Sequence, residues 1–179
     1  MRCFLSAGHG PRTRGGYDPG ADPAGPAEEH ALCGGIVRAI AHAMAVVEPH
    51  VVPGGDLATK IAYVNRWSRP GDVAVEIHLN SGPPEAKGAE AYYYSVPARP
   101  FASELHAALV KIGRGPRGVK LDTSSQHPKG LAWCRQTKPW AALVEVAFIT
   151  NPAELLWLTD GGGVQAAALA LAKGVDAWP

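Results

Sequence analysis

Three side chains capable of metal or proton chemistry lie in or beside apolar, strand-like runs of this sequence. Glu145 is a lone carboxylate within the run 143–149, where an ionised group is costly to desolvate without a partner. His9 follows the first apolar run, and His78 lies near the end of another. Open α/β sheets build their sites at the carboxyl ends of strands, so we expect these side chains to converge on one rim. Two imidazoles and a carboxylate on one rim indicate bound zinc.

Each of these side chains also has an ordinary structural explanation. A buried glutamate is more often a paired structural carboxylate than a catalytic base, and a lone histidine in a loop is usually solvated. Glu76 precedes His78 by two residues and therefore shares its strand face. It can accept a hydrogen bond from that imidazole, or it can pair with a nearby lysine or arginine. Both explanations for Glu76 stay open at this point.

The rest of the chain alternates short strands with amphipathic helices. Apolar spacing predicts strands over 2–7, 50–53, 72–79, 88–95, 131–134 and 141–148. The predicted helices begin at Glu28 and end before Pro49, begin at Asp56 and end before Pro70, span 99–112, begin at Asn151-Pro152, and span 163–175. Residues 10–27 and the basic stretch 114–120 are predicted loops. This alternation predicts an α/β fold with a mostly parallel sheet between layers of helices.

The composition excludes several classes of function. Lys and Arg number 17 against 16 Asp and Glu, which argues against nucleic acid or acidic lipid as the main partner. The three cysteines form no Cys-x-x-Cys pair, so neither a disulfide framework nor a thiolate zinc finger is indicated. No apolar run approaches the ~20 residues of a membrane span, and no signal peptide is evident. We therefore expect synthesis in the cytoplasm without membrane insertion.

Five motifs follow one another along the chain. They are Gly8-His9-Gly10, Asp18-Pro-Gly-Ala21, a glutamate that opens the first helix, Ile77-His78-Leu-Asn80, and Leu143-Val-Glu145 running into Phe148-Ile-Thr-Asn151. In this order they resemble the zinc-dependent N-acetylmuramoyl-L-alanine amidases of the amidase 3 type, found in bacterial cell-wall hydrolases and phage endolysins. The resemblance spans nearly the whole chain. It implies a twisted, mostly parallel six-stranded sheet with helices on both faces.

The same resemblance implies a role for each candidate residue. One zinc ion per chain is expected on His9, Glu28 and His78, with Glu145 as the general base. Zinc would activate water for attack on the amide between N-acetylmuramic acid and L-alanine. We prefer Glu28 to its neighbour Glu29 because steps of four from Glu28 reach the larger apolar side chains of the first helix.

The expected organisation is a single catalytic domain over residues 1–179, without a separate wall-binding domain. We expect a monomer that acts on peptidoglycan after release from the cytoplasm, as a phage or prophage lysis enzyme. The catalytic cleft itself must then bind the substrate. Candidate residues that help to bind it are Arg114, Arg117 and Lys120. His127 is the one remaining histidine that we place near the cleft.

Two other functions remain as alternatives. A zinc peptidase acting on the stem peptide would share a similar sheet and a carboxylate base, because fold alone does not select the bond that is cut. A non-catalytic wall-binding module would use aromatic stripes or repeats and would not need a base at Glu145. The sequence contains no such repeat.

Overall fold

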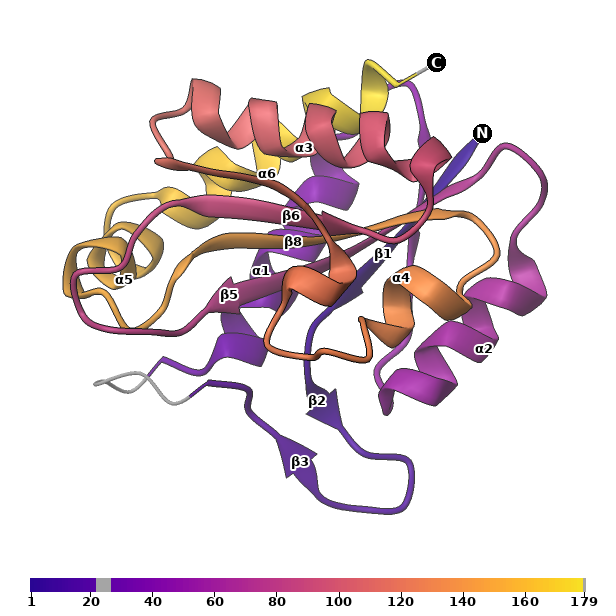
Figure 1. Cartoon of the computed structure of the whole chain (residues 1–179), viewed down its shortest axis with the longest axis horizontal. Helices are drawn as coiled ribbons and strands as arrows, with labels where there is room; N and C mark the ends of the chain where they lie inside the picture. Colours follow the sequence, from indigo (N-terminus) through magenta and orange to yellow (C-terminus); the bar gives the residue numbers. More distant parts are fainter. Residues whose placement is uncertain (22–26, 179) are drawn as a thin grey trace.

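A six-stranded sheet forms the centre of the protein (Figure 1). The computed structural model describes residues 1–21 and 27–178, so part of the loop predicted over 10–27 lies outside the described residues. The strand order is β4-β1-β5-β8-β6-β7, and every neighbouring pair is parallel except β6 with β8. The strands are β1 (Arg2–Ala7), β4 (Glu48–Val51), β5 (Val73–Asn80), β6 (Ala89–Tyr93), β7 (Pro116–Leu121) and β8 (Trp140–Phe148). The prediction of a mostly parallel six-stranded sheet is confirmed.

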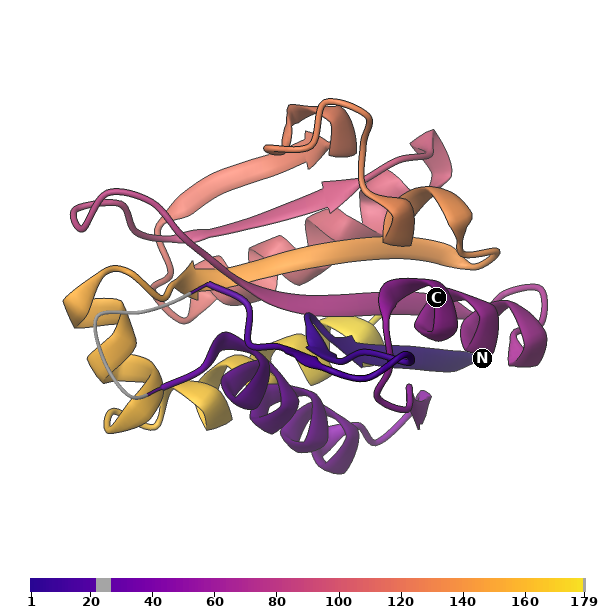
Figure 2. The same ribbon diagram turned by 90° about the horizontal axis from the view of Figure 1, so that it is seen from below.

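Helices cover both faces of this sheet, as predicted. One face carries α1 (Glu29–Ala43), α3 (Arg99–Lys111) and α6 (Gly163–Asp176), and the other carries α2 (Leu57–Trp67) and α4 (Ala132–Gln136). In Figure 2, α1 and α6 lie side by side along the sheet. The predicted cap residues of α2 and α5 (Pro152–Thr159) are confirmed, since Asp56 and Asn151 accept hydrogen bonds from the first-turn backbone of these helices.

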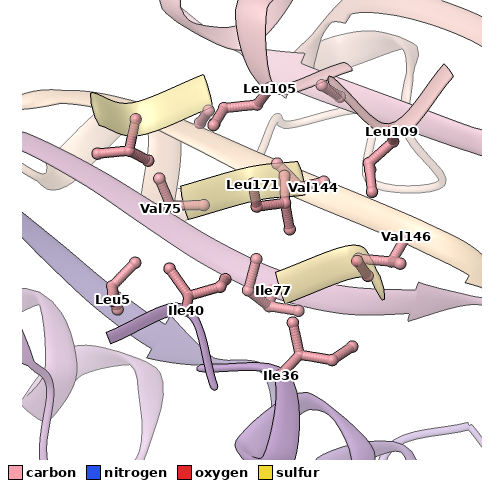
Figure 3. Close-up of a cluster of buried hydrophobic side chains, with 14 of the residues drawn as sticks. Leu5, Ile36, Ile40, Val75, Ile77, Leu105, Leu109, Val144, Val146 and Leu171 are labelled. Atoms are coloured by element: carbon pink, nitrogen blue, oxygen red, sulfur yellow. The ribbon is translucent and has the colours of Figure 1, made fainter. Parts of the chain in front are cut away.

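The larger core lies on the face covered by α1, α3 and α6, and it is mostly aliphatic (Figure 3). Buried side chains from the helices meet others from the sheet; those labelled in Figure 3 are Ile36, Ile40, Leu105, Leu109 and Leu171 from helices, and Leu5, Val75, Ile77, Val144 and Val146 from strands. Because side chains alternate along a strand, the residues between these positions face α2 and α4. His78 on β5 and Glu145 on β8 are such residues.

Two element predictions in the second half of the chain are wrong. Residues 131–134 were expected as a strand, but they lead into helix α4, where Trp133 and Cys134 are buried against the sheet. A short apolar run does not distinguish a buried strand from a buried helix. The stretch 114–120 was expected as a loop, but most of it forms β7, an edge strand whose exposed polar residues hide the strand pattern. The sheet still has six strands because β7 takes the place of the strand expected at 131–134.

Strands β2 (Gly10–Pro11) and β3 (Tyr17–Asp18) pair antiparallel and project away from the main sheet at the bottom of Figure 1. Among the described residues, no single helix is long and apolar enough to cross a membrane. Helices α5 and α6 pass that test only together, as a pair bent by 81°.

Candidate active site

The predicted site residues converge near the carboxyl ends of three neighbouring strands. His78 and Glu145 are partners in the parallel register of β5 and β8, so their side chains leave the same face of the sheet side by side. His9 lies two residues beyond the end of β1, which pairs with the other edge of β5. The expectation that these three residues share one rim is therefore confirmed.

His9, Glu29 and His78 form a compact group that could hold a metal ion. One donor atom from each residue lies within 4.8 Å of the others. Glu29 lies between the imidazoles, with Oε2 3.3 Å from His9 Nε2 and Oε1 3.2 Å from His78 Nδ1. Its side chain is 2 % exposed, and it also accepts hydrogen bonds from the backbone N–H groups of Ala21 and Leu79. These contacts leave the carboxylate a single orientation, directed at both histidines.

The expectation that Glu28 would join the histidines is wrong. Glu28 is exposed, and its carboxylate accepts a hydrogen bond from the Tyr17 hydroxyl at 2.8 Å. Helix α1 begins at Glu29, while Glu28 is the extended N-cap residue with φ −94° and ψ 139°. Counting helical steps from Glu28 therefore starts outside the helix. The buried residues of α1 are Glu29, Cys33, Ile36, Val37 and Ile40. Their helical spacing places Glu29, and not Glu28, on the buried face of the helix, and this spacing is visible in the sequence.

Two glycines leave room for the group. A Cβ atom on Gly8 would lie 2.4 Å from His78 Cε1, and one on Gly20 would lie 2.4 Å from Glu29 Oε2. Gly20 also has φ +87°, a conformation that side chains disfavour. A residue larger than glycine at either Gly8 or Gly20 would displace a candidate ligand. This steric requirement explains one glycine in each of the motifs Gly8-His9-Gly10 and Asp18-Pro-Gly-Ala21.

Lys60 on α2 supports the loop that carries His9, a role that was not predicted from the sequence. Its ammonium group donates to the carbonyl oxygens of Ala7 and His9, at 2.6 Å each, and the residue is 4 % exposed. The backbone of His9 has φ 57°, which is uncommon for a residue other than glycine. The two hydrogen bonds stabilise this turn. A helix lysine is ordinarily solvated, so its sequence position offers no signal of burial.

Each imidazole has a second carboxylate at its other nitrogen. Asp18 Oδ1 lies 3.2 Å from His9 Nδ1, and Glu76 Oε2 lies 3.3 Å from His78 Nε2. Metal-bound histidines commonly have such a partner, which selects the tautomer and the orientation of the ring. Of the two explanations left open for Glu76, the structure supports the contact with the imidazole. Within the described residues, no lysine or arginine lies at ion-pair distance from Glu76.

The site shifts the proton affinities of its carboxyl groups in opposite directions. Burial opposes ionisation of Glu29, but the contacts with His78 and His9 outweigh it and hold the pKa of Glu29 well below its usual range. Burial raises the pKa of Glu145 to about 7, although the neighbouring His78 counteracts part of this effect. Glu145 Oε2 is buried and has no hydrogen-bond partner among the described residues. One glutamate is thus a permanent anion, while the other can exchange a proton near neutral pH.

A cleft of about 620 Å³ opens over the group. The candidate ligands and Glu145 line it together with residues from β6, β7 and the loop after β7, including Glu90, Tyr92, Arg117, Lys120 and His127. The expectation that Arg117, Lys120 and His127 lie at the cleft is confirmed. Arg114 is not among the lining residues, since its guanidinium pairs with Glu154 and lies over the ring of Trp157.

Comparison with known proteins identifies the family. Residues 3–177 match the family model of N-acetylmuramoyl-L-alanine amidase, Amidase_3. The chain belongs to this amidase family. Membership confirms the resemblance drawn from the five motifs. His9, His78 and Glu145 from those motifs line the cleft described above.

Solved amidase structures share this fold. The N-acetylmuramoyl-L-alanine amidase from Clostridium difficile 630 aligns with a TM-score of 0.83 at 22% identity, over 98% of this chain and 94% of that one. The catalytic domain of the CD27L endolysin targeting Clostridia difficile aligns with a TM-score of 0.74 at 24% identity, over 98% and 96% of the two chains. At these identities the likeness shows the fold alone.

One relative found by sequence is the uncharacterized protein YqiI of Bacillus subtilis (strain 168). It is 33% identical in an alignment of 117 residues, and the match covers 60% of this chain and 51% of YqiI. The matched region thus spans about half the length of that relative.

Proposed function

We propose that this amidase hydrolyses the bond between N-acetylmuramic acid and L-alanine in peptidoglycan, with one zinc ion held by His9, Glu29 and His78. The observation that carries the proposal is the position of Glu29, a buried carboxylate between two imidazoles, with Glu145 on the adjacent strand. A structural ion pair would need only one of these contacts. Three converging donors beside an unpartnered carboxylate oxygen are typical of a catalytic metal site.

The spacing of the donors supports zinc. Ligand bonds of about 2.0–2.2 Å in a tetrahedral zinc site place neighbouring ligand atoms about 3.3 Å apart. Glu29 Oε2 lies 3.3 Å from His9 Nε2 and Glu29 Oε1 lies 3.2 Å from His78 Nδ1, so each imidazole lies at this spacing from one carboxylate oxygen. Two neutral imidazoles and one carboxylate form a donor set of catalytic zinc enzymes, and they leave a fourth position for water or substrate.

When bound, zinc would polarise the lactyl carbonyl and lower the pKa of water toward ~7. Glu145 would then take a proton from the attacking water and return it to the departing amine of L-alanine. Its place beside His78 on the sheet brings it next to the metal group, and a pKa raised to about 7 suits exchange near neutral pH. A nearby cation lowers the pKa of a carboxyl group, so Glu145 would be ionised when the reaction begins.

The surrounding residues would keep the ligand atoms in place. Asp18 and Glu76 orient the imidazoles, because each lies against the nitrogen that faces away from Glu29. Lys60 stabilises the turn that contains His9, through hydrogen bonds to two backbone carbonyl oxygens of that turn. None of these three residues needs to touch the substrate to affect the rate.

Digestion of purified peptidoglycan tests the proposal. New L-alanine amino termini should appear without new reducing sugar ends, a chelator should abolish them, and added zinc should restore them. New amino termini at other positions of the stem peptide would indicate the peptidase alternative instead. Sedimentation with the wall without any cleavage would indicate a binding module. The Glu145→Gln protein serves as the control for contaminating hydrolases.

We also propose that the enzyme acts as a monomeric, endolysin-like lysis enzyme, made in the cytoplasm and reaching the wall after release. An endolysin catalytic domain, that of CD27L, is one of the solved structures with this fold. Expression in a bacterial host with and without a membrane-permeabilising protein tests it. Lysis only when the membrane is permeabilised is expected, whereas lysis in both cultures would point to another export route.

A further inference from the structure

One wall of the cleft carries two cations from the edge strand β7. Arg117 and Lys120 both line the cleft that contains Glu145, and their side chains are 38 % and 32 % exposed. We call these two residues the cationic wall. The proposed hydrolysis gives them no part, since the metal group and the base complete the reaction without them.

A single buried carboxylate holds both members of the cationic wall. Glu90 Oε2 accepts hydrogen bonds from Arg117 Nε, at 3.3 Å, and from Lys120 Nζ. Its Oε1 accepts from Asn80 Nδ2 at 2.6 Å and from the Tyr92 hydroxyl at 2.8 Å. One negative charge therefore faces two positive charges, and the wall keeps one surplus positive charge at the cleft.

The guanidinium of Arg117 is prepared to bind an anion. Its Nε is committed to Glu90, and its Cζ lies 4.7 Å from the centre of the Phe148 ring, so two contacts restrain the group. Within residues 1–21 and 27–178, its two terminal NH₂ groups have no hydrogen-bond partner. Terminal guanidinium groups bind a carboxylate with parallel, charge-assisted hydrogen bonds.

The sheet places this wall within reach of the bond to be cut. Glu90 and Glu145 are partners in the antiparallel register of β6 and β8, and Lys120 pairs with Tyr92 on the far side of β6. Strands lie about 4.8 Å apart, so β7 is about 10 Å from the strand of the base. An extended peptide rises at most ~3.6 Å per residue, so the second residue after the cut bond approaches side chains that extend from β7.

The chemistry of the stem peptide supplies an anion at that distance. L-alanine is followed by glutamate linked through its side-chain carboxyl group, whose α-carboxyl group is a free carboxylate in some walls and an amide in others. We propose that Arg117, assisted by Lys120, binds the free α-carboxylate of this isoglutamate. The enzyme then favours stem peptides with isoglutamate over those with isoglutamine. This inference rests on the proposed amidase function. It adds the group on the substrate, the α-carboxylate of isoglutamate, that the cleft recognises.

Two peptidoglycans that differ only in amidation of this residue test the inference. The zinc-loaded protein should release L-alanine amino termini from the free-carboxylate wall with a roughly 10- to 100-fold higher kcat/KM than from the amidated wall. Arg117→Gln should bring this ratio close to one, and Arg117→Lys, which keeps the charge without the guanidinium, should give an intermediate ratio. Lys120→Gln should lower the ratio in part.

Arg66→Gln is the matched control. Arg66 also lies over an aromatic ring, at 5.3 Å from the centre of Trp67, but it does not line the cleft. This variant should keep the wild-type ratio. Thermal unfolding and zinc content of each variant show whether it is folded and loaded, and the substrate ratio is independent of the amount of active protein.

The outcomes separate this inference from the proposed function. If the wild-type protein releases L-alanine termini equally fast from both walls, the carboxylate site is wrong and the amidase function stands. A preference that survives in folded Arg117→Gln protein would also overturn the assignment to Arg117. If neither wall releases L-alanine termini, the proposed function fails and the inference fails with it.

Discussion

Glu76 Oε2 lies 3.3 Å from His78 Nε2, on the opposite side of the imidazole from Glu29, which lies 3.2 Å from Nδ1. The ring is thus held between two carboxylates, one belonging to the candidate metal group of His9, Glu29 and His78 and one on the opposite side of the ring. Glu76 is 2 % exposed and its other oxygen accepts a hydrogen bond from the Ser6 hydroxyl at 3.2 Å. This arrangement fixes Nδ1 of His78 as the nitrogen available to a metal.

Glu76→Gln should therefore weaken zinc binding by roughly 10- to 100-fold while the fold is retained. Glutamine keeps the shape of the side chain but loses the charge that orients the imidazole. Competition between the metal-free protein and a fluorescent zinc chelator measures the Kd directly. The control is Glu48→Gln, since Glu48 makes a similar contact with His50 at 3.0 Å on the exposed strand β4. Equal affinity in the wild-type and Glu76→Gln proteins would contradict the positioning role.

The choice between neighbouring glutamates gives a second prediction. Glu29→Gln should lose the stoichiometric zinc, because it removes a charged donor between two imidazoles. Glu28→Gln should keep one zinc per chain, since Glu28 is exposed and contacts Tyr17 instead. Elemental analysis after gel filtration decides between them. Zinc lost from the Glu28 variant and kept by the Glu29 variant would show that the metal group is assigned wrongly.

Glu145→Gln should lower kcat by roughly 10²- to 10⁴-fold while zinc content and folding stay near wild type, as expected for loss of a general base. The base acts in its ionised form, so wild-type kcat/KM should fall as the pH decreases through the pKa of Glu145. Burial raises that pKa to about 7 in the absence of metal. Bound zinc should lower the pKa, so the fall in kcat/KM should occur at a lower pH. A pH–rate profile with zinc content measured at each pH checks this. Activity that rises on acidification would exclude Glu145 as the base.

A fourth prediction concerns stability away from the site. Asp72 accepts hydrogen bonds from the backbone and side chain of Arg2 and from the backbone of Arg69, so it ties β1 to the turn before β5. Asp72→Asn should lower the free energy of unfolding by about 2 kcal/mol at pH 7, because the partly buried Arg2 guanidinium loses its anion. Urea unfolding measures this loss. The surface substitution Asp160→Asn should change stability by no more than about 0.5 kcal/mol.

The effect of Asp72 should depend on pH in a defined direction. Burial opposes ionisation, but the contacts with Arg2 and Arg69 outweigh it and hold the pKa of Asp72 below its ordinary value. The stabilisation is therefore complete above the unfolded-state pKa of about 3.9 and is lost as the pH falls through the lower folded-state pKa. The wild-type and Asp72→Asn proteins should converge in stability at acidic pH. A difference that grows on acidification would contradict this assignment.

The fold class and most of the candidate site could be predicted from local sequence patterns. Strand runs with a period of two and helical runs with steps of three and four are local signals, and their alternation predicted the mostly parallel sheet. Because parallel strands end at one edge, the runs around His9, His78 and Glu145 were enough to place these residues on one rim. The motif order then pointed to the amidase family that the comparison confirmed.

The contacts between charged groups could not be predicted in this way, because they depend on how the chain folds. Glu28 and Glu29 differ by one residue, which turns a side chain by about 100° around a helix, so the start of α1 decides which glutamate contacts the two histidines. The partners of Glu76, Lys60 and Arg117 come from segments distant in the sequence. Periodicity describes neighbours along the chain, whereas a buried charge is stabilised by whatever group the folded chain brings within about 3 Å of it.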